Sequence, residues 1–162
     1  MKKIIILVIT IVSLIGILAL VGAINTNDSQ PSEISGPATL SSEENSFDFG
    51  TISMEAGLVR HSFAVKNTSQ EEVIIDKIYT SCMCTEAILR IDGEDYGPFG
   101  MPGHGISKVN KKLGVGEEAV VEVVFDPAAH GPAGVGFIER AVYLENDSGA
   151  PFVLVIKATV SP

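Results

Sequence analysis

Residues 58–67 read LVRHSFAVKN and decide the class of fold, because apolar and polar side chains alternate along them. Val59, Phe63 and Val65 share one face of this stretch, and Arg60, Ser62 and Lys66 share the other. Successive side chains of a β-strand point to opposite faces, so this spacing predicts a half-buried strand. The polar run over residues 67–70 is typical of the turn that follows.

The same period of two returns from residue 46 to residue 162, and Gly, Pro, Asn and Asp interrupt it at short intervals. The stretches expected to form strands are Phe47–Thr51, Leu58–Asn67, Val73–Ser81, Ala119–Phe125, Ile138–Leu144 and Phe152–Val160. Val73–Ser81 is apolar on both faces, and Arg140 interrupts the apolar face of its strand. This pattern predicts an all-β, Ig-like β-sandwich of about seven strands over residues 46–162.

A Gly-rich insertion spans residues 92–116 and carries 7 Gly in 25 residues. An irregular segment of that length in a compact domain is usually functional or disordered. Its Pro and Gly alternate with Phe99, Met101 and Ile106, which favours a packed loop.

The first 24 residues predict a membrane anchor. Residues 4–24 carry no charge and follow Lys2 and Lys3, and about 20 apolar residues span a hydrocarbon core. A cleaved signal peptide is the alternative, with Val21-Gly22-Ala23 as the cleavage site. Positive residues stay on the cytoplasmic side, so we expect a single-pass membrane protein with its domain outside the cytoplasm, or a secreted one if the signal is cleaved. Residues 25–45 are polar and predict a flexible linker.

The charge balance argues against nucleic acid as a partner. The chain has a net charge of −9, and without Lys2 and Lys3 the remaining nine basic and twenty acidic residues give −11. No basic patch is left to bind phosphates. Nor does the sequence contain a nucleophile elbow, a His-Glu-x-x-His motif or a phosphate-binding Gly loop. We therefore expect a protein that is not an enzyme.

Several short motifs in order resemble one bacterial family. They are Phe47-Asp48-Phe49-Gly50-Thr51-Ile52, His61-Ser62-Phe63 with Lys66-Asn67-Thr68, Ser81-Cys82-Met83-Cys84-Thr85, and Val124-Phe125-Asp126-Pro127. Residues 46–160 thus resemble a bacterial Ig-like domain family of unknown function, whose fold is similar to the sandwich of ASH and major-sperm-protein domains. Met83 stands where the family usually has Gly, and the insertion is a second departure. The resemblance implies a fold and an exported location, but no activity.

Cys82 and Cys84 are the two cysteines of the chain. If the backbone stays extended, both sulfurs leave the same face, with Cα atoms about 6–7 Å apart. Three states are open at this point: a disulfide, a pair of free thiols, or two thiolates on a soft metal such as copper or zinc.

Residues elsewhere in the chain favour the metal. His104 with Met101 in the Gly-rich insertion, and His130 after the Asp126-Pro127 stop, add imidazoles and a thioether to the two thiols. These are soft to borderline ligands, which suit copper or zinc. Cys82, Cys84, His104 and His130, with Met101 nearby, form the hypothetical metal site. His61 lies on an apolar face and is expected to be a hydrogen-bonded core residue instead.

Three functions follow from these patterns. The first is a membrane-anchored, non-enzymatic Ig-like module that binds or assembles with another envelope protein, for instance by pairing at a sheet edge. The second is a copper-type metal-binding protein. The third is a thiol–disulfide protein that uses the Cys-x-Cys pair as a redox couple.

Overall fold

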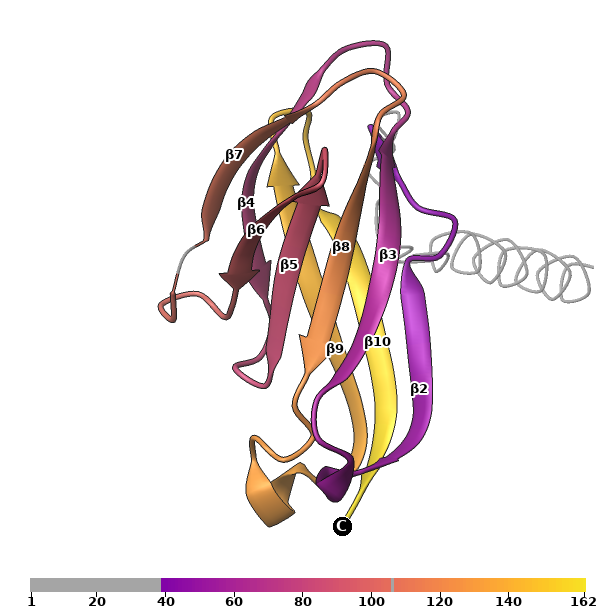
Figure 1. Ribbon diagram of the computed structural model, residues 1–162, viewed down its shortest axis with the longest axis vertical. Helices are drawn as coiled ribbons and strands as arrows, with labels where there is room; N and C mark the ends of the chain where they lie inside the picture. The colour runs from indigo at the N-terminus through magenta and orange to yellow at the C-terminus, as the bar shows by residue number, and fades with distance from the viewer. Residues whose placement is uncertain (1–38, 106) are drawn as a thin grey trace, which may run out of the picture. The chain divides into compact units, whose positions relative to one another are not determined.

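The computed structural model describes residues 39–105 and 107–162, which form ten strands and two short 3-10 helices (Figure 1). In chain order the elements are β1 (Leu40–Ser41), β2 (Ser46–Ser53), η1 (Met54–Ala56), β3 (Val59–Asn67), β4 (Val73–Thr80), β5 (Thr85–Ile91), β6 (Glu94–Phe99), β7 (Lys108–Leu113), β8 (Glu118–Phe125), η2 (Gly131–Gly134), β9 (Gly136–Asn146) and β10 (Phe152–Ser161).

These strands form two five-stranded sheets, in the orders β1-β3-β8-β5-β6 and β2-β10-β9-β4-β7. Neighbouring strands are antiparallel, except for β2 and β10, which run parallel. Both sheets contribute to a single apolar core. The predicted all-β class is therefore confirmed, but the described residues hold ten strands rather than about seven.

The inward faces are those that the alternation predicts. Phe63 and Val65 are buried on β3, while Arg60, Ser62 and Lys66 are exposed or partly exposed on its other face. The buried side chains of the other predicted strands are Ala119, Val121, Val123, Phe125, Ile138, Val142, Leu144, Leu154, Ile156, Ala158 and Val160. Burial of such apolar area is the main stabilising term in a sandwich of this size.

A bulge explains why β4 lacks a simple alternation. Val73 and Ile75 face the core, and then the pairing shifts between Ile75 and Lys77 on both sides of the strand. After the shift Ile78 and Thr80 face inward instead. An extra residue in a strand reverses which side chains are buried, so periodicity alone could not assign this face.

The Gly-rich insertion over residues 92–116 is not one long loop. Its first part forms β6, which pairs back onto β5, and its second part forms β7, which pairs with β4. Phe99, 1% exposed, joins the core. Together with β1 and β5, these two edge strands are the four strands that the expected stretches did not include.

The domain also begins earlier than residue 46. Leu40 is 2% exposed, and β1 pairs with the end of β3, so the sandwich reaches into the segment predicted as linker over residues 25–45. The predicted anchor over residues 1–24 lies outside the described residues, as does the linker up to residue 38. Within residues 39–105 and 107–162, no helix has the length and apolar character to cross a membrane.

Candidate functional site

A tight turn between β4 and β5 carries both cysteines. The backbone N–H of Thr85 donates to the carbonyl of Cys82 over 3.1 Å, and Oγ1 of buried Thr80 lies 2.9 Å from the carbonyl oxygens of Cys82 and Thr85. The turn brings the two Cα atoms to 5.3 Å, and the sulfurs are joined in a disulfide. Of the three states left open by the sequence, the structure therefore has the disulfide, and the turn brings the Cα atoms closer than the roughly 6–7 Å of an extended segment.

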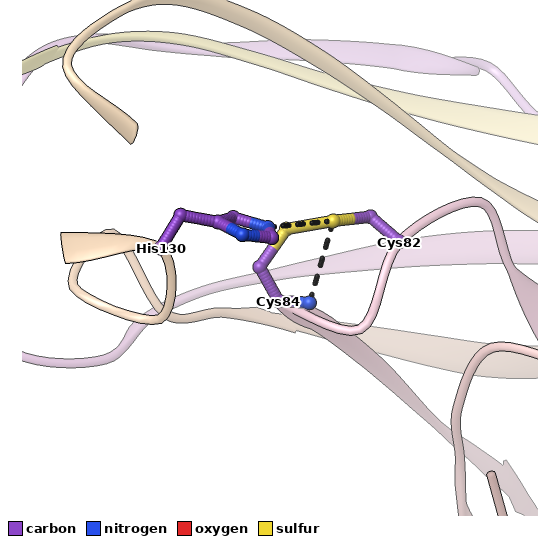
Figure 2. A group of neighbouring side chains, drawn as sticks. All are labelled: Cys82, Cys84 and His130. Carbon is purple, nitrogen blue, oxygen red and sulfur yellow. Dashed lines mark hydrogen bonds between the residues drawn. A yellow bond between two sulfur atoms is a disulfide. The ribbon is translucent and has the colours of Figure 1, made fainter. Parts of the chain in front are cut away.

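His130 reaches the disulfide from the loop between β8 and η2. Its Nε2 lies 3.2 Å from Sγ of Cys82, and Figure 2 shows the ring directed at the two sulfurs. A disulfide sulfur carries no proton, so the imidazole N–H is the donor in this contact. The loop is shaped by Asp126, whose carboxylate accepts the N–H of Ala128 and whose own N–H donates to Cys84 O.

Arg140 contacts the second sulfur from the strand that neighbours β4 in the same sheet. It lies on β9, and its Nε donates to Sγ of Cys84 over 3.4 Å. The strand is held against the cysteine turn by reciprocal hydrogen bonds of 2.9 Å between Ser81 and Ala141. Each sulfur of the disulfide thus has a nitrogen donor from a different part of the fold.

The two sulfurs differ in their access to solvent. Cys84 is 3% exposed and belongs to the core, whereas Cys82 is partly buried at its edge and His130 is exposed. A shallow pocket of about 350 Å³ lies beside them and includes both His130 and Arg140 in its lining. Val135 and Phe137, 44% and 67% exposed, line the same pocket, and Met83 between the cysteines is 60% exposed. Cys82 is therefore the sulfur that a partner can approach.

Three of the five predicted metal ligands come together. The ligand atoms of Cys82, Cys84 and His130 lie within 4.8 Å of one another, and no other His, Cys, Asp or Glu of the described residues joins this group. The structure does not bring His104 into it. After β6 the chain lies next to the end of β4, where Gly100 O accepts the N–H of Thr80. Met101 and His104 then form a turn of their own, in which the N–H of His104 donates to Met101 O.

Arg140 is the site residue that the sequence analysis did not assign. Its signal was present, because a charged side chain stood at an inward position between Ile138 and Val142. His61 is hydrogen-bonded as expected, through Nε2 to Glu44 over 2.9 Å, and it stacks on Phe47. It is only partly buried, with a side chain that is 19% exposed.

The fold and the site define an Ig-like β-sandwich with a Cys-x-Cys disulfide set between an imidazole and a guanidinium. Residues 40–92 match the model of a family described as "Protein of unknown function (DUF1573)". This match includes the cysteine turn and confirms the resemblance drawn from the motifs. No curated protein matches the chain.

Several solved structures align with this chain at low sequence identity. A protein of unknown function from Porphyromonas gingivalis W83 aligns with a TM-score of 0.55 and 10% identity over 75% of this chain and 46% of that one. A family 123 glycoside hydrolase from Clostridium perfringens aligns with a TM-score of 0.50 and 6% identity over 72% of this chain and 22% of that one. The ASH / PapD-like domain of human CEP192 aligns with a TM-score of 0.42 and 13% identity over 76% and 85%.

This chain therefore spans less than half of the Porphyromonas protein and about a fifth of the hydrolase. The likeness concerns the fold alone, since one fold serves many functions. It leaves the expectation of a non-enzymatic protein as a prediction.

Proposed function

We propose that the chain is an Ig-like binding module outside the cytoplasm, and that it acts on a cysteine-containing envelope protein by thiol–disulfide exchange at Cys82 and Cys84. The observation that carries the proposal is the pair of nitrogen donors on the sulfurs, His130 on Cys82 and Arg140 on Cys84. Cationic and imidazole neighbours favour the thiolate, which is the reactive form of cysteine.

The small number of residues that the disulfide encloses argues against a mainly structural role for it. The two cysteines are two residues apart, so the closed loop contains only three residues. In the chain-entropy account such a loop stabilises the fold by about 1.6 kcal/mol, about half of what a 15-residue loop contributes. A disulfide that adds little to stability can open without unfolding the domain.

The expected location supports the same function. Disulfides persist in oxidising compartments outside the cytoplasm. The charge-free run over residues 4–24 behind Lys2 and Lys3 supports export and membrane anchoring of the domain. The partner would then be another envelope protein.

The exchange uses the unequal exposure of the two sulfurs. In the reduced chain, the thiolate of Cys82 attacks a partner disulfide, forms a mixed disulfide and releases one partner thiolate. The thiolate of Cys84 then attacks Sγ of Cys82, which re-forms the internal disulfide and releases the second partner thiolate. The partner disulfide gains two electrons, and the cysteine pair loses two. The reverse sequence oxidises a partner dithiol.

The surface around Cys82 supports a polypeptide as the partner. Val135 and Phe137 are exposed apolar side chains in the pocket that is also lined by His130 and Arg140, the two residues that contact the sulfurs. Met83, between the two cysteines, is exposed as well. Exposed apolar groups that gather at one place are typical of contacts with another protein.

The test is the reduction potential of the full chain, equilibrated in glutathione buffers and measured by trapping free thiols. We expect a potential above about −300 mV, because structural disulfides of secreted proteins lie below that value. His130→Ala should lower the measured potential, since it removes the donor that stabilises the Cys82 thiolate, and His104→Ala is the matched control. A cysteine pair that stays oxidised in strongly reducing buffer would contradict the proposal. The same reduction potential in His130→Ala and in His104→Ala would contradict it as well.

A further inference from the structure

The cysteine pair and His130 place three soft donor atoms at one point of the surface. Sγ of Cys82, Sγ of Cys84 and a ring nitrogen of His130 lie within 4.8 Å of one another. Ligands bonded to one ion at about 2.3 Å for sulfur and about 2.0 Å for nitrogen lie roughly 3.5–4 Å apart. Opening the disulfide frees the sulfurs to separate to that spacing, and Nε2 is already 3.2 Å from Sγ of Cys82.

From this geometry we infer that the reduced chain binds one Cu(I) ion through Cys82, Cys84 and His130. The inference rests on the reversible disulfide of the proposed function. Reduction by a dithiol transfers two electrons and two protons to the pair, and Cu(I) then displaces the two thiol protons. In the disulfide form neither sulfur is a thiolate, so the oxidised chain does not bind the ion.

The number and type of donors favour Cu(I) over zinc. The described residues supply two thiolates and one imidazole, and no carboxylate or further His joins them. Soft sulfur ligands select Cu(I), whereas structural Zn(II) almost always takes four protein ligands in a tetrahedron. Three donors at an exposed edge therefore suit a cuprous ion better than a structural zinc.

Arg140 completes the charge balance. Two thiolates and one Cu(I) carry a net charge of −1, and the guanidinium of Arg140 already donates to Sγ of Cys84 over 3.4 Å. Charged groups that hold a ligand in this way tune metal affinity without touching the metal. Arg140 would thus position Cys84 and offset the remaining negative charge.

Access to the ion fits transfer rather than permanent burial. His130 is exposed and Cys82 is partly buried, whereas Cys84 lies in the core. The His130 face of the site opens into the shallow pocket that Val135 and Phe137 line. An incoming ligand can therefore replace His130 first while both sulfurs still hold the metal.

The experiment titrates the full chain in detergent, reduced and freed of reductant under nitrogen, with Cu(I) against a chromophoric Cu(I) chelator. We expect one Cu(I) per reduced chain and none per oxidised chain. Cys82→Ser with Cys84→Ser should abolish binding. His130→Ala should weaken binding at least tenfold, and His104→Ala, which changes a histidine outside the group, should leave it unchanged.

Three outcomes would overturn the inference. They are reduced wild type that retains no more Cu(I) than the double serine variant, equal affinity in His130→Ala and wild type, or stoichiometric Zn(II) with no Cu(I) held against the chelator. A thiol count on each sample separates this result from the proposed function. Two free thiols without copper would refute the copper site alone, while copper binding without exchange with a partner disulfide would refute the exchange alone.

Discussion

Two turns of the sandwich contain polar side chains, and they use them differently. At the end of β3, the side chain of Asn67 is 0% exposed, donates to the carbonyls of Glu71 and Leu113 and accepts from Ser69. At the end of β4, the sulfurs of the cysteine turn instead contact His130 and Arg140, which reach them from the β8–η2 loop and from β9. The side-chain hydrogen bonds of the first turn join it to itself and to β7, and they support the fold. The second keeps contacts whose strength depends on the redox state of the sulfurs.

The largest effect should come from breaking the first turn. Asn67→Ala removes this donor from the carbonyl of Glu71 and from the buried carbonyl of Leu113, and we expect a loss of about 2–3 kcal/mol in the free energy of unfolding. Urea unfolding of the full chain measures it.

Asn146→Ala is the matched control for that measurement. Asn146 also sits at a turn between strands, but its Nδ2 contacts to Ala150 O and Leu144 O are long, at 3.3 and 3.5 Å. We expect a loss of about 1 kcal/mol or less. Equal losses in the two variants would mean that the Asn67 turn has no special structural role.

Removing the disulfide should cost less than removing Asn67. For Cys82→Ser with Cys84→Ser we expect a loss of about 1–2 kcal/mol, because the closed loop is so short. The same urea series measures it. A loss as large as that of Asn67→Ala would make the bridge a structural staple and weaken the proposed function.

A smaller, residue-specific effect should separate the two sulfurs. In the reduced chain at neutral pH, His130→Ala should slow alkylation of Cys82, and Arg140→Gln should slow that of Cys84. We expect about tenfold in each case, because a hydrogen bond to a charged group contributes about 1.5 kcal/mol or more. Peptide mass spectrometry after timed alkylation reads each cysteine separately. Equal effects of both variants on both sulfurs would show that the contacts do not act on individual thiolates.

The smallest effect should come from a third turn, between β5 and β6, which an exposed ion pair flanks. Arg90 donates to both carboxylate oxygens of Asp95, and this hydrogen bonding lowers the pKa of Asp95 below its ordinary value. A lowered pKa contributes stability above the ordinary Asp pKa and loses it as the pH falls through the lowered one. Arg90→Gln should therefore raise the Asp95 pKa and remove this acid-dependent contribution.

Carboxyl NMR titration of Asp95 checks that shift, and Arg60→Gln is the control, because Arg60 pairs with Glu122 instead. Exposed pairs of this kind stabilise proteins little, so unfolding at neutral pH should hardly change. A marked loss of stability would show that exposed charges flanking a turn matter as much as the buried amide of Asn67.

Sequence patterns predict those parts of this molecule where one rule acts alone. Alternation located the inward faces of β3, β8, β9 and β10, because each has one face in the core. It failed at β4, where a bulge reverses the faces, and at β6 and β7, which lie within an insertion whose Gly-rich composition resembles a loop. Edge strands bury few side chains, so they leave little trace in the hydrophobic pattern.

The sequence predicted only part of the candidate site, for a similar reason. Residue chemistry singled out Cys82, Cys84 and His130, which the structure brings together, but it could not exclude His104. The position of His104 depends on how β6 pairs with β5 and on where the turn of Met101 and His104 then lies. Strand pairing between distant residues decides both, and the local sequence does not. In the sequence, Arg140 stood out only as a charged residue on an otherwise apolar strand face. Its partner Cys84 lies 56 residues away, so the pattern around Arg140 could not reveal the contact.

The parallel pairing of β2 with β10 has a consequence for the order of folding. β10 is the sheet neighbour of β2 among the described strands, and Ser53 donates to a carbonyl 109 residues further along the chain. Contacts so distant in sequence form late and slow the folding reaction. During synthesis β2 stays unpaired until β10 has been made, whereas the turn between β4 and β5 can already form. Pulse-labelled hydrogen exchange should therefore show β2 protected last, after β10 has paired with its sequence neighbour β9.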